Sequence, residues 1–120
     1  MKKLNILIII LIILTGCNTN NKIRLEYADK IDLKLTSEKG LIEIQLDYDE
    51  AKIFVDNINK LEVEKISKQN IEGWSLYARG FDKNNKELFK ISFLNSLVNI
   101  NNDWYQTNQD SIIKITDNYK

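Results

Sequence analysis

The sequence contains no histidine, and its only cysteine lies near the N-terminus. Histidine is the side chain that most often transfers protons near neutral pH, so its absence removes the usual general base. The sequence also has no glycine-rich phosphate loop and no motif that sets a serine beside a general base. We therefore expect a protein that is not an enzyme and that holds no cofactor.

Long hydrophobic and long basic runs are missing as well. The apolar stretch Leu4–Leu14 is interrupted only by Asn5 and falls well short of the roughly 20 residues of a membrane-spanning helix. The 17 basic side chains are balanced by 17 acidic ones, and no run of Lys and Arg occurs. Because phosphate binding requires a concentrated positive face, nucleic acid is not an expected partner. Proline is absent while Ile, Asn and Lys are abundant, a bias that reflects an AT-rich genome more than a functional demand.

The N-terminus does contain the parts of a bacterial export signal. Lys2 and Lys3 precede the apolar stretch, Thr15 and Gly16 are small residues that suit a processing site, and Cys17 follows them. The run Leu14-Thr15-Gly16-Cys17 resembles the lipobox of bacterial lipoprotein precursors. In these precursors a diacylglyceryl group is attached to the cysteine sulfur, and a peptidase cuts just before that residue.

The resemblance implies that residues 1–16 are a signal peptide and that Cys17 is the lipid-attachment site. Two acyl chains give stable membrane attachment, so the protein is expected at the cell membrane, lipid-anchored on the extracytoplasmic face. We expect residues 17–29 to be the lipidated N-terminus and tether, and residues 30–120 to be a single domain. An uncleaved signal anchor, or a buried helix that contains Cys17, is the alternative interpretation. Over residues 41–106 the chain is also similar, in its predicted order of strand, helix and meander and in its Asn-Asn-Asp-Trp-Tyr segment at 101–105, to small lipoproteins of low-GC Gram-positive bacteria that carry one short α+β domain.

The first half of the domain changes its hydrophobic period near Asp47. Apolar residues alternate with polar ones over residues 31–36 and 42–46, on either side of a turn at 37–40, which predicts a β-hairpin over residues 31–46. Beyond Asp47, apolar residues recur at helical spacing and predict an amphipathic helix of about three turns: Ala51, Phe54, Val55, Ile58 and Leu61. Residues 61–66 fit either a short strand or the end of this helix.

Carboxylates cluster at the start of the predicted helix, at Asp47, Asp49 and Glu50. Carboxylates in this position accept hydrogen bonds from free backbone N–H groups and oppose the positive end of the helix dipole. A calcium-binding EF-hand loop would require glycine as its sixth residue, where this segment has Ala51 and Lys52. We therefore expect helix capping here, and neither catalysis nor a metal site.

The second half predicts a meander of strands at residues 74–81, 87–94, 97–100 and 104–106, with Phe89, Ile91 and Phe93 in the core. Residues 107–110 precede an apolar segment at 111–115 that fits a capped C-terminal helix or a short last strand. Together these elements predict an α+β fold. It consists of a mostly antiparallel β-sheet with one amphipathic helix packed on it and a short C-terminal helix.

Large apolar side chains occur at both parities of the strand at 74–81. One parity carries Trp74, Leu76 and Ala78, and the other carries Tyr77, Arg79 and Phe81. Either the C-terminal helix or residues 22–28 cover the second face, or it is exposed for a partner. Because aromatic residues and arginine are enriched at protein interfaces, Tyr77, Arg79 and Phe81 form the candidate interaction surface.

The leading hypothesis is a non-enzymatic, membrane-anchored lipoprotein that acts as a binding module at the cell envelope. Its partners are membrane lipid, through acylated Cys17, and another envelope protein or an incoming protein. The alternative is a lipoprotein that binds a small molecule or cell-wall fragment in a pocket between helix and sheet, lined by Phe54, Ile58 and the meander aromatics. A hydrolase ranks third, since it needs two carboxylates at catalytic separation in one cleft.

Overall fold

The computed structural model describes residues 22–120, and in this part of the chain seven strands form one sheet that is accompanied by two helices. Every pair of neighbouring strands is antiparallel, so the fold is α+β with a mostly antiparallel sheet, as predicted. The predicted signal peptide and Cys17 lie outside the described residues. None of the helices within residues 22–120 has the length and apolar character needed to cross a membrane.

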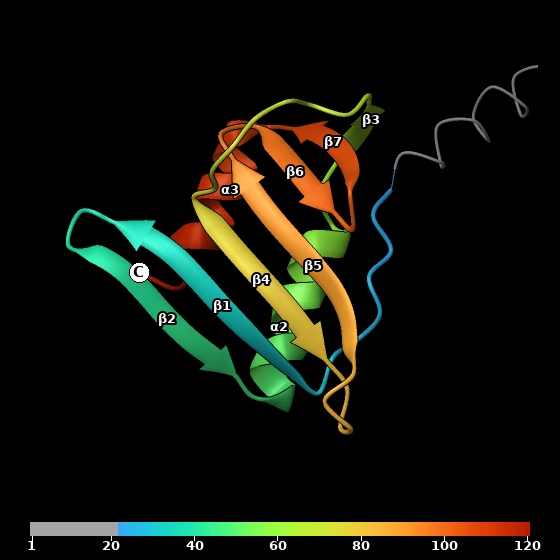
Figure 1. Cartoon of the computed structure of the whole chain (residues 1–120), viewed down its shortest axis with the longest axis vertical. Coiled ribbons are helices and arrows are strands. Elements are labelled where there is room, and N and C mark those ends of the chain that lie inside the picture. Colours follow the sequence, from blue (N-terminus) through green and yellow to red (C-terminus); the bar gives the residue numbers. More distant parts are fainter. Residues whose placement is uncertain (1–21) are drawn as a thin grey trace, which may run out of the picture.

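The strand order across the sheet is β2-β1-β4-β5-β6-β7-β3 (Figure 1). The bounds of the strands are β1 Lys30–Ser37, β2 Gly40–Leu46, β3 Val63–Ile66, β4 Leu76–Phe81, β5 Glu87–Leu94, β6 Leu97–Ile100 and β7 Asp103–Thr107. Helix α2 spans Tyr48–Asn59 between β2 and β3, and helix α3 spans Gln109–Asp117 after β7. The predicted C-terminal segment is therefore a helix and not a strand.

The tight turns of the sheet depend on residues that tolerate positive φ. The β1–β2 hairpin is confirmed, with Leu33 opposite Ile44, and Gly40 adopts φ +114° where the chain enters β2. In the meander, four asparagines take the left-handed conformation at the turns: Asn85, Asn95, Asn101 and Asn102. Asparagine is among the few non-glycine residues that visit this region readily, so these turns form without glycine.

Of residues 61–66, which fitted either a strand or a helix end, Val63–Ile66 form the short edge strand β3. It pairs with β7, so that Val63 lies opposite Thr107, and this places β3 at the far edge of the sheet from β2. Helix α2 makes the crossing behind the sheet in Figure 1. The chain then returns through residues 67–75 to the middle of the sheet, where β4 begins at Leu76, two residues later than predicted.

Both helices pack on the same face of the sheet and cover the core. Helix α2 buries Ala51, Phe54, Val55 and Ile58, and α3 buries Ile112 and Ile115. On the sheet, β5 contributes the expected core residues Phe89, Ile91 and Phe93, each at most 2% exposed. Asp47 caps α2 through a reciprocal pair of contacts with Glu50, which confirms the capping interpretation of these carboxylates.

Residues 22–29, which the sequence analysis assigns to the tether, lie against the helix side of the domain. Ile23 and Ala28 are buried in the core, at 4% and 1% exposure. Leu25 exchanges two hydrogen bonds with the Asn59 side chain at the end of α2, at 2.8 and 3.2 Å. Burial of these apolar side chains and the hydrogen bonds of the Leu25 backbone hold residues 23–28 on the domain. The packed part of the chain therefore begins at Ile23.

Candidate functional site

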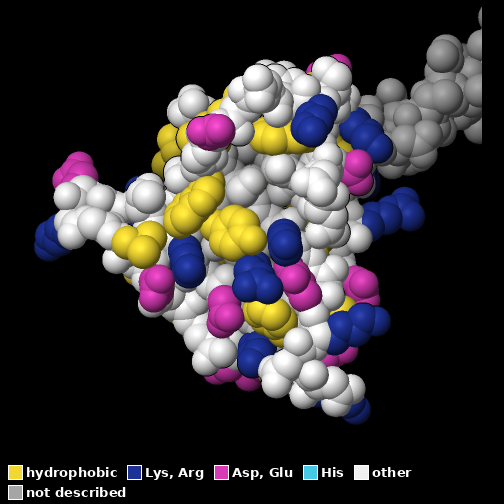
Figure 2. All heavy atoms as spheres, in the orientation of Figure 1, with side chains coloured by type: hydrophobic (Ala, Val, Ile, Leu, Met, Phe, Trp, Pro, Cys, Tyr) yellow, Lys and Arg dark blue, Asp and Glu magenta, His cyan; other side chains and the backbone are white. Residues whose placement is uncertain are grey.

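The face of the sheet opposite the helices carries the three residues of the candidate interaction surface. Along β4, Leu76, Ala78 and Gly80 are buried under the helices, while Tyr77, Arg79 and Phe81 point the other way and are half-buried. This division follows from the two-residue period of a strand. Figure 2 views this face and shows hydrophobic side chains near its centre, with basic and acidic side chains around them.

Neither of the two segments that the sequence analysis offered as a cover lies over these three residues. Helix α3 places Ile112 and Ile115 in the core, on the opposite side of the sheet, and residues 22–28 also pack on that side. Within the described part of the chain, no helix lies over Tyr77, Arg79 and Phe81 (Figure 1). We call this helix-free side of the sheet the open face.

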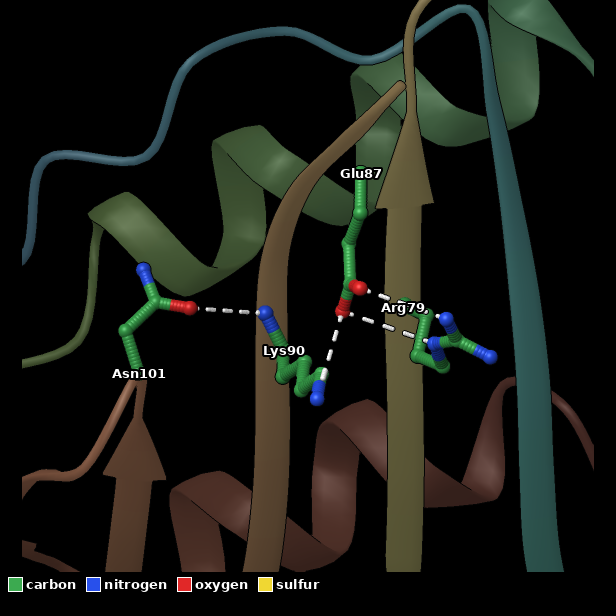
Figure 3. Close-up of polar contacts among 4 residues, drawn as sticks. All are labelled: Arg79, Glu87, Lys90 and Asn101. Carbon is green, nitrogen blue, oxygen red and sulfur yellow. Dashed lines mark hydrogen bonds and ion pairs between the residues drawn. The ribbon is translucent and has the colours of Figure 1, made fainter. Parts of the chain in front are cut away.

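Arg79 is held in place by Glu87 on the neighbouring strand (Figure 3). Its Nε and Nη2 atoms donate to the two Glu87 carboxylate oxygens at 3.4 and 3.2 Å, and Lys90 Nζ lies 3.9 Å from the same carboxylate. The hydrogen bond and the charge of Glu87 raise the pKa of Arg79, so the guanidinium stays protonated. The two-point contact fixes the plane of the guanidinium on the open face.

Two cations lie close to the Phe81 ring on the open face. The Arg79 guanidinium carbon is 5.1 Å from the centre of the Phe81 ring, and Lys30 Nζ is 5.6 Å from it. Both distances fall within the range of a cation–π contact. Arg79 therefore joins the Phe81 ring on one strand to the Glu87 carboxylate on the next.

Trp74 belongs with Tyr77 and not with Leu76 and Ala78, which corrects the parity that the sequence analysis gave it. The Trp74 and Tyr77 rings lie 5.8 Å apart at an interplanar angle of 36°. The reason is that Trp74 precedes β4, and the bend at Ser75 breaks the alternation that holds within the strand. The open face thus gains a fourth half-exposed residue beside the predicted three. We define the open-face cluster as Trp74, Tyr77, Arg79 and Phe81.

Charges of both signs surround this cluster. Tyr77 lies between Lys34 on β1 and Ser92 on β5, and Lys34 Nζ lies 3.8 Å from a carboxylate oxygen of Glu43 on β2. Arg79 lies between Asp32 and Lys90 in the same way. Aromatic side chains with one fixed arginine, inside a polar rim, are the residue types found at the centre of protein interfaces.

The pocket expected between helix and sheet is filled at the place where the sequence analysis put it. Phe54 and Ile58 have 0% exposure and pack in the same core as Phe89 and Phe93. A groove of about 760 Å³ lies instead where the C-terminal end of α2 and helix α3 meet the ends of β3 and β7. Lys60 and Lys114 line this groove, and neither is among the site residues predicted from the sequence. No local signal marks them, because only the topology brings these two positions together.

Among residues 22–120, no group of three or more His, Cys, Asp or Glu side chains is placed to hold a metal ion. The Asp82 carboxylate accepts backbone N–H bonds from Asn84 and Lys86, at 2.8 and 2.9 Å, and so stabilises the β4–β5 turn.

No protein-family model, no curated protein and no solved structure matches this chain. Function is therefore inferred from the residues and their geometry.

Proposed function

We propose that this chain is a lipid-anchored protein of the bacterial cell envelope whose domain binds another protein through the open-face cluster and catalyses no reaction. The observation that carries the proposal is the half-exposed cluster of Tyr77, Arg79 and Phe81 on a sheet face over which no described helix lies. A large aromatic surface of this kind gains free energy when a partner removes it from water. The partner is another envelope protein or an incoming protein.

The contacts of Arg79 favour a protein partner. Two of its three nitrogens bond to Glu87, and among the described residues Nη1 makes no hydrogen bond. That nitrogen can donate to a backbone carbonyl or carboxylate of the partner. Because Glu87 and the Phe81 ring already fix the guanidinium, little side-chain entropy is lost on binding. Tyrosine, tryptophan and arginine are also the residues at which binding energy most often concentrates.

The lipid anchor is part of the same proposal and depends on the lipobox-like run that ends in Cys17. Only five residues, 18–22, separate Cys17 from the buried Ile23. At about 3.5 Å per extended residue, this segment spans no more than roughly 20 Å. A domain tethered so closely meets membrane proteins at high effective concentration, so a modest intrinsic affinity is sufficient.

Anchoring is tested by expressing the full chain and its Cys17→Ser variant in a Gram-positive host supplied with an alkyne-bearing fatty acid. We expect the parent chain to be labelled and to sediment with membranes, and the variant to lose both properties. Thr15→Ser, which keeps a small residue in the motif, serves as the control and should behave like the parent chain. If the Cys17→Ser variant stays in the membrane fraction and the parent chain is unlabelled, the apolar stretch is an uncleaved anchor and the lipid assignment is wrong.

The binding surface is tested by cross-linking and pull-down from solubilised membranes with the full chain as bait. The Tyr77→Ala/Phe81→Ala double variant is compared with Tyr48→Ala/Ile53→Ala, which removes exposed apolar side chains from α2, on the other side of the sheet. Loss of one interface hot spot costs about 2 kcal/mol, or roughly a 30-fold weaker affinity. A partner recovered by the parent and by the α2 variant, but not by the Tyr77/Phe81 variant, supports the proposal. Equal recovery by both variants, with both shown to be folded, contradicts it.

A further inference from the structure

A concave surface lies on the helix side of the domain and is separate from the open face. It is the groove of about 760 Å³, and its lining comes from four elements that meet only in the folded chain: the end of α2, β3, β7 and α3. Ligand sites for small molecules have volumes of roughly 300–1,000 Å³. The groove is thus of a size for a small molecule or a short peptide.

The groove has an apolar floor and polar walls. Leu61, Val63 and Ile115 line it and are at most 8% exposed. Ser111 and Asn118 lie along α3 on the same side as Ile115, and Asn57 lies on the last turn of α2. Their hydroxyl and amide groups offer both hydrogen-bond donors and acceptors.

Two lysines and two glutamates line the groove. Lys60 caps the C-terminal end of α2 and Lys114 lies in the last turn of α3, and among the described residues neither forms an ion pair. Of the two acidic residues that line the groove, Glu64 lies opposite Gln106, one step from the core-facing Val63. By the alternation of the strand, the Glu64 side chain points to the other face of the sheet. Glu62 remains as the one acidic side chain at the rim.

We propose that this groove binds a short peptide by its free C-terminal carboxylate. Lys60 and Lys114 pair with the carboxylate, and the apolar side chain of the last residue packs on Leu61, Val63 and Ile115. The amide and hydroxyl groups of Asn57, Ser111 and Asn118 bond the peptide backbone, and Glu62 accepts from one of its N–H groups. Two lysines without an ion pair, in a groove that Leu61, Val63 and Ile115 also line, complement an anion that carries an apolar group, and a peptide C-terminus is such an anion.

The test follows binding by methyl NMR spectra of the full chain in non-ionic detergent, with Ile, Leu and Val methyl groups labelled. The probe is the peptide N-acetyl-Ala-Ala-Val with a free carboxylate, and its matched control is the same peptide with a C-terminal amide. We expect the acid to cause saturable shifts of the Leu61, Val63 and Ile115 methyl signals. The amide is expected to bind at least tenfold more weakly, because it lacks the charge that Lys60 and Lys114 pair with.

Two double variants separate the groove from general charge effects. Lys60→Ala/Lys114→Ala should weaken binding of the acid at least tenfold, whereas Lys83→Ala/Lys86→Ala, which removes the same charge at the exposed β4–β5 turn, should not. Equal binding of acid and amide, equal binding by the two variants, or no saturable shift of the floor methyl groups overturns the proposal. Hexanoate binding as tightly as the peptide would overturn the assignment to a peptide, since a fatty acid has no backbone for the polar walls to bond.

Discussion

Gly80→Ala probes the closest contact between the backbone of β4 and the core. Gly80 lies opposite Phe89 on β5, and a Cβ atom at Gly80 would come within 2.3 Å of Cζ, 2.5 Å of Cε2 and 2.8 Å of Cε1 of the Phe89 ring. Carbon atoms in contact are normally about 3.5 Å apart, so the ring would have to retreat by about 1 Å. Phe89 is only 2% exposed and belongs to the packed core, so its ring can retreat only by displacing neighbouring side chains. Overpacking of this kind costs about 1–3 kcal/mol.

The cost is measured by urea unfolding, followed through the fluorescence of Trp74 and Trp104. A loss of about 2 kcal/mol lowers the midpoint by about 1 M at a typical slope of 2 kcal/mol/M, with the slope unchanged. The cause is isolated by repeating Gly80→Ala in a Phe89→Leu background, where the three ring atoms are absent. The cost there should fall below about 0.5 kcal/mol, which gives a coupling of at least about 1 kcal/mol between the two sites. If Gly80→Ala costs the same in both backgrounds, the ring contact is not the reason.

Two further predictions concern helix α2 and the C-terminal residues. Asp47→Ala should lower the free energy of unfolding by about 1 kcal/mol because it removes the cap of α2, and Asp49→Ala, which makes no capping bond, should cost less than about 0.5 kcal/mol in the same urea assay. Burial and the nearby Glu50 raise the pKa of the Tyr119 hydroxyl in the folded chain. As the pH rises, this hydroxyl therefore loses its proton in the unfolded chain before it does so in the folded chain, and the free energy of unfolding should fall from about pH 10 upward. Tyr119→Phe should make that fall less steep, and an unchanged slope between pH 9 and 11 would contradict the assignment.

The order and type of most elements followed from the sequence because the turns are marked by particular residues. The bounds of β5 and β6 match the prediction, since asparagine turns end the alternating pattern on either side. Residues 61–66 remained ambiguous because four residues of strand do not establish a period. Their pairing with β7 is set by contacts far apart in sequence, which local pattern does not encode.

Only the grouping of the site residues on one strand was predictable, because the rest of the site depends on contacts between residues far apart in sequence. Strand alternation alone grouped Tyr77, Arg79 and Phe81 on one side of β4. Whether that side of β4 was covered depended on the face of the sheet on which the two helices pack. The packing of the whole core determines that face, and local sequence does not show it. The pairing of Arg79 with Glu87 depended on the register between β4 and β5, which includes an irregularity at Gly80 and Phe81. The groove had no sequence signal at all, since its lining is assembled from four separate elements.

The place of β3 at the far edge of the sheet has a consequence for how the chain folds. The β1–β2 hairpin and the β4–β7 meander join strands that are neighbours in sequence, and such pairs close quickly. By contrast, the Thr107 hydroxyl and the Glu62 carbonyl, which bond at the start of β3, are 45 positions apart. Closing so long a loop costs entropy before its contacts form, so the docking of β3 is expected late. A growing chain that has not yet reached Asp103 carries β3 without its partner strand, so the second edge of the sheet is completed only after β7 has been synthesised.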